Sequence, residues 1–192
     1  NMNNMNYEAR KNYAEMPKNV KQDCLKSNEA FVRLVWPVIS EVCGGGVIRP
    51  IETFDGLVSR DLDILAGIDV LQIIDGLGCR GIASRVQFSD PKFGDKDWQT
   101  FTIRESRIGS TGETELEKRF RAVNGMRGII APYLTVQSYI SVDGSRLVGC
   151  GVARTVDIFR AIEMGLFTRN SYDNANFIVV KYQDVDGVWS FA

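Results

Sequence analysis

Two apolar runs separated by a glycine-rich turn constrain the fold of this chain more than any other feature. The runs cover residues 69–75 and 81–88, and the turn between them covers residues 76–79. Apolar and β-branched residues on both sides of such a turn are typical of a β-hairpin. An acid-rich segment, residues 61–69, leads directly into the first strand. Carboxylates at the mouth of a hairpin can hold a divalent metal, so this segment raises the question of a metal site.

The other elements follow from local periodicity and turn signals. The spacing of Phe31, Leu34, Val35 and Val38 predicts an amphipathic helix over residues 26–42. The same reasoning predicts, in chain order, a strand at 98–107, a capped helix at 114–124, strands at 133–142 and 146–154, a helix from Thr155, and strands at 177–182 and 188–191. We therefore expect an α/β (α+β) fold with a mixed central sheet flanked by helices. Its order would be an α-β-β-β-α-β core with a C-terminal β-α-β extension.

The composition limits the chemistry and the setting of the chain. It has no histidine, which excludes Ser-His-Asp and Cys-His catalysis and His-ligated zinc. Its 23 Lys+Arg and 24 Asp+Glu nearly cancel, which favours neither a nucleic-acid coating protein nor a membrane-surface binder but leaves room for a local basic face. The four cysteines are widely spaced, and no apolar run approaches the roughly 20 residues that cross a bilayer, so we expect reduced thiols and no secretory leader. We expect a cytoplasmic single domain at residues 22–192, after a polar segment at residues 1–21, with no membrane partner.

The predicted order of elements resembles the PD-(D/E)xK nuclease-like superfamily. The resemblance covers about residues 26–142, and it rests on a Gly-Ile-Asp sequence ending at Asp69 and on the pair Val86-Gln87 in the next strand. In that family a helix precedes a three-stranded meander, a second helix crosses over, and a further strand completes a mixed sheet. The resemblance implies phosphodiester chemistry in which Asp69 is the metal-binding acid and Glu41, from the preceding helix, is a further acid.

The second motif of that family departs from its pattern in this chain. Gln87 stands at the acid position, and Ser89 stands where the family has a lysine that helps to activate water. A lysine displaced onto the following helix would be Lys118. The candidate catalytic residues are therefore Asp69, Gln87 and Lys118, and the candidate ligands for Mg²⁺ are Asp69, Glu41 and Asp63. The same acids also fit a simpler interpretation, as loop residues and a strand cap that hold no cofactor.

A second candidate site follows from the period of two along a strand. Arg85 and Gln87 share one face of their strand, as do Thr102 and Arg104 of theirs. If these strands are neighbours, the sheet presents a polar row suited to phosphate. The candidate phosphate-binding residues are Arg85, Arg104, Arg119 and Gln137. Alternatively, the row is the solvent-facing side of a sheet, and the charges of the helix at 114–124 pair with one another at i, i+4.

Two functions from different classes fit these observations. The first is a divergent nuclease-like protein, active or inactive, that engages nucleic acid or nucleotide phosphate; an active form would be a Mg²⁺-dependent phosphodiesterase. The second is a non-enzymatic phage or mobile-element accessory protein that binds a protein partner. The near-zero net charge and the missing lysine favour the second. A salt titration separates the two, because phosphate contacts weaken steeply with salt. No oligomeric state is predicted.

Overall fold

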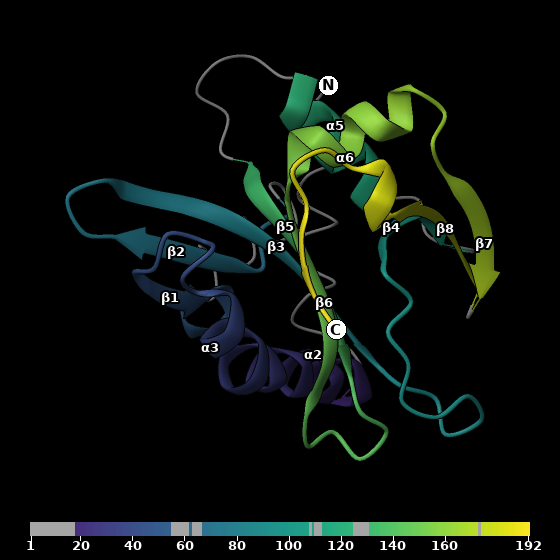
Figure 1. Cartoon of the computed structure of the whole chain (residues 1–192), viewed down its shortest axis with the longest axis horizontal. Helices are drawn as coiled ribbons and strands as arrows, with labels where there is room; N and C mark the ends of the chain where they lie inside the picture. Colours follow the sequence, from purple (N-terminus) through teal and green to yellow (C-terminus); the bar gives the residue numbers. More distant parts are fainter. Residues whose placement is uncertain are drawn as a thin grey trace.

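A computed structural model of the chain describes residues 18–54, 62, 67–107, 109, 113–124, 131–172 and 174–192. It contains helices, one mixed sheet and one smaller sheet, which confirms the predicted α+β class (Figure 1). Most of the polar segment predicted at residues 1–21 lies outside the described residues, and helix α2 (Lys18–Ala30) is the first described element. Among the described helices, none is long and apolar enough to cross a membrane.

The main sheet has six strands in the order β1-β2-β3-β5-β6-β9. These strands are β1 (Val47–Pro50), β2 (Val70–Ile74), β3 (Gly78–Phe88), β5 (Pro132–Ile140), β6 (Leu147–Arg154) and β9 (Trp189–Phe191). Neighbouring strands are antiparallel except β3 and β5, which are parallel. The two predicted hairpins are confirmed as β2–β3 and β5–β6.

The strand predicted at residues 98–107 forms, but it does not lie beside β3 as expected. This strand, β4 (Thr100–Arg107), pairs with β8 (Ala175–Lys181), which also pairs with β7 (Thr168–Tyr172) in a separate three-stranded sheet. The place beside β3 belongs to β5, whose residues are nearly all buried, as expected of a strand covered on both faces. A three-stranded meander does exist, but it is β1–β2–β3, because residues 47–50 form a strand that we did not predict.

One face of the main sheet is covered by the N-terminal helical segment (Figure 1). Here α2 continues through a π-helical turn, η1 (Phe31–Val35), into α3 (Trp36–Ile39). The buried side of this helical segment packs against Val70, Ile82 and other apolar residues of the sheet, and together they form one cluster. The predicted helix at residues 26–42 is therefore confirmed, although it begins earlier and ends at Ile39.

The π-helical turn changes which residues of this helix are buried. It ends two residues before Pro37, which has no N–H donor, and the N–H of Trp36 donates to the carbonyl of Phe31, five residues earlier, as in a π-helical turn. Because a π-helical turn contains one more residue than an α-helical turn, the buried positions after it are shifted by one residue along the sequence. Ile39 is fully buried, whereas Val38, which we predicted on the stripe, is 37% exposed.

The other face of the main sheet is covered by the three-stranded sheet together with α5 (Glu115–Asn124) and α6 (Thr155–Glu163) (Figure 1). Two glycines of β6 let this second layer approach closely. A Cβ atom on Gly149 would lie 2.3 Å from Oδ2 of Asp97, and one on Gly151 would lie 2.4 Å from Cζ of Tyr182. No side chain fits at either position, so the second layer lies directly on the backbone of β6.

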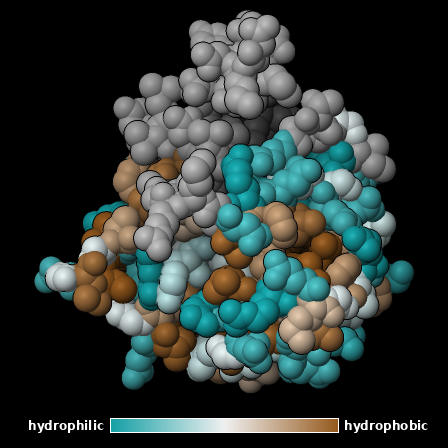
Figure 2. Space-filling view, turned by 90° about the horizontal axis from the view of Figure 1, so that it is seen from above, coloured by the Kyte–Doolittle hydropathy of each residue, from teal (hydrophilic) through white to brown (hydrophobic). Residues whose placement is uncertain are grey.

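The surface seen from above mixes polar and apolar side chains. In Figure 2, the apolar atoms of the described residues form small groups separated by polar ones. Exposed apolar side chains come from many elements, for example Leu25 on α2, Leu77 in the β2–β3 turn and Met164 after α6. Single exposed apolar side chains are ordinary on a protein surface and do not by themselves mark a docking site.

Candidate functional site

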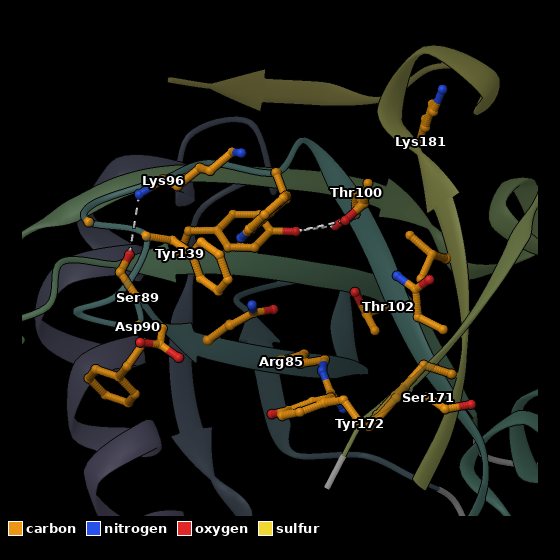
Figure 3. A pocket seen from close by; sticks show the side chains of 18 of the residues that line it. Arg85, Ser89, Asp90, Lys96, Thr100, Thr102, Tyr139, Ser171, Tyr172 and Lys181 are labelled. Carbon is orange, nitrogen blue, oxygen red and sulfur yellow. Dashed lines mark hydrogen bonds between the residues drawn. The ribbon is translucent and has the colours of Figure 1, made fainter.

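A cleft of about 1010 Å³ lies between the two sheets, beside the C-terminal end of β3 (Figure 3). Its walls come from β3, β4, β5, β7 and β8 and from the loop at residues 89–99. Its charged lining residues are Arg85, Lys96, Lys181 and Asp90, and its aromatic lining residues are Phe88, Phe93, Trp98, Tyr139, Tyr172 and Phe177. Basic side chains outnumber acidic ones in this lining, so the cleft attracts anions. Its volume is at the upper end of the range for small-ligand sites.

The floor of the cleft is made by alternate residues of β3 and β5. In the parallel register, Arg85 lies opposite Gln137, and Gln87 lies opposite Tyr139. The Tyr139 side chain is buried, and its hydroxyl donates to the carbonyl of Thr100 at 2.8 Å. Burial raises the pKa of Tyr139 to about 12, so this hydroxyl is neutral at physiological pH. The floor is therefore polar, and Arg85 supplies its charge.

Three arginines surround Glu115, the first residue of α5. An Nη of Arg119 donates to Oε1 of Glu115 at 2.5 Å, the backbone N–H of Arg104 donates to Oε2 at 3.2 Å, and Nη1 of Arg85 lies 3.8 Å from Oε2. Burial acts to raise the pKa of Glu115, but Arg119 and then Arg85 outweigh it, and the pKa is lowered. The group therefore contains one carboxylate and three guanidinium groups, with an excess of positive charge.

Several buried donors of this region have no hydrogen-bond partner among the described residues. They are Nε of Arg104, Nε and Nη1 of Arg119, and Nε2 of Gln137. Arg119 is only 2% exposed and Gln137 only 1% exposed, while Oε1 of Gln137 accepts the N–H of Thr102 at 3.2 Å. A buried donor without an acceptor is costly, so this arrangement suits an anion with several oxygen atoms.

Arg85 links the arginine group to an aromatic wall of the cleft. Its guanidinium lies 4.7 Å from the ring centroid of Phe177, and that of Arg104 lies 5.9 Å from the same centroid. The ring of Tyr172 stacks on Phe177, with centroids 5.4 Å apart and an interplanar angle of 30°. Burial lowers the pKa of Arg85, and Glu115 opposes this effect. Cations placed on aromatic rings in this way are suited to ligands that combine negative charge with a flat ring.

The loop at residues 89–99 carries a second group of cations and rings. Nζ of Lys96 lies 3.9 Å from the centroid of Trp98, and Nζ of Lys92 lies 5.4 Å from the centroid of Phe93. The rings of Phe93 and Trp98 meet edge to face, with centroids 6.3 Å apart. All of these except Lys92 line the cleft, which therefore has basic and aromatic side chains on this wall as well.

The acids predicted to bind Mg²⁺ are found in different settings. Asp69 stands directly before β2 and accepts the N–H of Ser84, on β3, at 2.7 Å. Glu41 is exposed in the turn after α3, and Asp63 lies outside the described residues. Within the described part of the chain, no group of three or more Cys, Asp or Glu residues is placed to hold a metal ion. We therefore derive no chemical step through a metal.

The remaining predicted site residues divide between the cleft and its surroundings. Gln87 lines the cleft, and Arg85, Arg104, Arg119 and Gln137 gather beside its floor. Lys118 lies on α5 next to the buried arginine and is not a lining residue. The predicted i, i+4 pair of Glu115 and Arg119 forms, but it is largely buried rather than on a solvated helix face, because α5 packs against β4.

Sequence reasoning missed the aromatic walls of the cleft. Trp98, Tyr172 and Phe177 were not among the candidate site residues. These residues come from separate elements, and only the pairing of β4 with β8 and of β8 with β7 brings them to one cleft. One signal was present: Lys92, Phe93, Lys96 and Trp98 occur close together within a single loop.

Comparisons with family models, curated proteins and solved structures found no match to this chain. Its function is therefore inferred from its own residues.

Proposed function

We propose that the cleft between the two sheets binds the phosphate groups of nucleic acid or nucleotides, on a nuclease-like scaffold. The observation that carries the proposal is the group of Arg85, Arg104 and Arg119 around the single carboxylate of Glu115. Guanidinium groups present planar sets of N–H donors that match phosphate oxygens. Unpartnered N–H groups of two of these arginines, at buried positions, support an additional anionic ligand in this region.

Aromatic side chains beside the cations support the nucleotide part of the proposal. Inorganic phosphate needs only donors, whereas a nucleotide also carries a base with two flat faces. Tyr172 and Phe177 supply rings next to Arg85 at one wall of the cleft. Stacking on such rings is a common way to bind bases without sequence preference.

The order of elements supports a relation to the PD-(D/E)xK nucleases. A helical segment precedes the meander β1–β2–β3, and the chain then passes through β4, which joins the second sheet, and through α5 to β5, which lies parallel to β3. Asp69 stands at the start of β2, and the strand with Arg85 and Gln87 follows it. We propose that this chain shares the scaffold and binds phosphate through arginines beside β3.

The proposal is tested by replacing Arg85 while keeping the size of the side chain. Arg85→Gln should weaken binding of a fluorescent thymidine nucleotide about tenfold or more, because a charge-assisted contact to phosphate contributes about 1.5–3 kcal/mol. Fluorescence anisotropy at low salt measures the Kd. The matched control is Arg33→Gln, on the helix-covered side of the sheet, where Arg33 pairs with Glu29 on the exposed surface. Equal affinity in Arg85→Gln and wild type would contradict the proposal.

Salt and Mg²⁺ separate the alternatives. Nucleotide affinity should fall as salt rises, because phosphate binding depends on charge. Failure to bind any nucleotide, together with salt-insensitive binding of a protein, would favour the accessory-protein alternative. Cleavage of an oligonucleotide that requires Mg²⁺ and is lost in Asp69→Ala would identify an active nuclease; cleavage that persists in this variant would remove Asp69 from the mechanism.

A further inference from the structure

The cleft carries a cation and an aromatic pair on each of two walls. On one wall, Arg85 lies over Phe177, and Tyr172 stacks on that ring. On the other, Lys96 lies over Trp98, whose ring meets Phe93. In Figure 3, Lys96 lies on one side of Tyr139, and Arg85 with Tyr172 lies on the other. The two groups are therefore separate features of one cleft.

We propose that the cleft holds a single strand of nucleic acid and engages at least two successive nucleotides. This proposal rests on the proposed function, since it assumes that the ligand carries phosphate. One base would stack at Trp98 and another at Tyr172, while Arg85 contacts the backbone phosphate between them. Each base needs one ring and each phosphate needs a cation, so two such groups exceed what one mononucleotide can use.

The polar floor between the two walls fits this arrangement. Gln87 and Thr102 also line the cleft and offer amide and hydroxyl groups to a sugar or a base edge. The volume of about 1010 Å³ lies at the upper end of the roughly 300–1,000 Å³ of small-molecule pockets, which leaves room for more than one nucleotide.

The side chains favour a single strand over a duplex. In a duplex the faces of the bases are covered by their neighbours, and only the strand ends present a free face. Trp98 is 44% exposed and Tyr172 is 58% exposed, so both rings are accessible to an unstacked base. Stacking proteins commonly combine such rings with a basic groove that follows the backbone.

The test compares ligand length and two kinds of variant. Fluorescence anisotropy would measure Kd for thymidine monophosphate, for single-stranded oligothymidylate and oligouridylate of about six nucleotides, and for a duplex of matched length. Wild type should bind a six-nucleotide single strand at least about tenfold more tightly than the mononucleotide and more tightly than the duplex. Trp98→Ala should remove most of this gain. Trp98→Phe, which keeps a ring, should restore much of it.

The control variant removes an equally exposed ring outside the cleft. Tyr133 is 46% exposed and has Arg80 at 4.8 Å from its ring centroid, but it is not a lining residue. Tyr133→Ala should therefore bind oligothymidylate as wild type does. This control separates loss of a particular stacking platform from a general effect of losing an exposed aromatic residue.

The outcomes distinguish this inference from the proposed function. Equal affinity for the mononucleotide and the oligonucleotide, with both lost in Arg85→Gln, would overturn the inference and support the proposed function. Oligonucleotide binding unchanged in Trp98→Ala, or tighter binding of the duplex, would also overturn it. Failure of every ligand to bind would overturn both. The inference is supported whether oligothymidylate or oligouridylate binds more tightly. A preference for one of them would identify DNA or RNA as the ligand.

Discussion

The two faces of the six-stranded sheet carry different mixtures of side chains, although each is packed against an apolar cluster. On the helix-covered face, Phe31, Ile39 and Val136 are fully buried in one apolar cluster. On the other face, Arg85 and Gln137 lie between the sheet and the second layer. Neighbouring residues of β5, Val136 and Gln137, point to opposite faces because side chains alternate along a strand. One face is therefore held by an apolar core, and the other combines an apolar core with polar groups that are kept in place beside the cleft.

The largest effect on stability is expected on the helix-covered face. Ile39→Ala should lower the free energy of unfolding by about 2–5 kcal/mol, because it opens a cavity in a fully buried site. Val38→Ala, at the next residue, should lower it by only about 0.5 kcal/mol, because Val38 is 37% exposed. Urea unfolding measures both. A larger loss in Val38→Ala than in Ile39→Ala would contradict the register of the π-helical turn.

An intermediate effect is expected where the second layer lies on β6. Gly151→Ala should lower the free energy of unfolding by about 1–3 kcal/mol, because the added Cβ would overlap the ring of Tyr182. The control is Ser190→Ala, at the exposed residue of β9 that pairs with Gly151, which should have little effect. If the two variants unfold at the same urea concentration, the close approach of Tyr182 does not matter for stability.

The smallest loss of stability among these three sites is expected for a substitution of Glu115, and this loss should depend on pH. Glu115→Gln removes the carboxylate from the arginine group, and we expect a loss of about 1 kcal/mol at neutral pH, since Gln can still accept a hydrogen bond. Anion binding should become tighter, because three guanidinium groups then lack a negative partner. Urea unfolding and nucleotide anisotropy measure the two effects, and weaker nucleotide binding in the variant would contradict this account of the arginines.

The pH dependence follows from the lowered pKa of Glu115. Its ionised form is favoured by folding, so its contribution is complete above the ordinary glutamate pKa of 4.5 and is lost as the pH falls through the lower pKa of the folded state. The stability difference between wild type and Glu115→Gln should therefore be constant near neutral pH and disappear at strongly acidic pH. A difference that grows on acidification would show that the carboxylate is not stabilised by its neighbours.

Local features of the fold were predictable from sequence because their causes are local. The turn at residues 76–79 and the alternating runs beside it specify the β2–β3 hairpin. The capping box also forms as predicted: the N–H of Thr114 donates to Glu117, and the N–H of Glu117 donates to Oγ1 of Thr114. In each case the interacting groups lie a few residues apart, so a short stretch of sequence contains both partners.

The pairing of distant strands was not predictable in the same way. The sequence around β4 contains no signal that predicts β8 as its partner. The strand β7 is a run of exposed polar residues without the apolar alternation that would indicate a strand. The role of Glu115 depends on the same long-range packing. Its i, i+4 spacing to Arg119 is visible in the sequence, but its burial requires α5 to pack against β4. The candidate arginines therefore lie close together, and their binding of phosphate stays a prediction, while the carboxylate and the rings beside them were not identified.

The pairing of β4 with β8 also has a consequence for the order of folding. The β2–β3 hairpin closes a loop of a few residues, whereas Thr100 must meet Lys181 across much of the chain. Contacts between distant residues cost more loop-closure entropy and form more slowly than local ones. The second sheet should thus form after the first hairpin. Because the cleft lies between the two sheets, the ability to bind a ligand should be one of the last properties that the refolding chain regains.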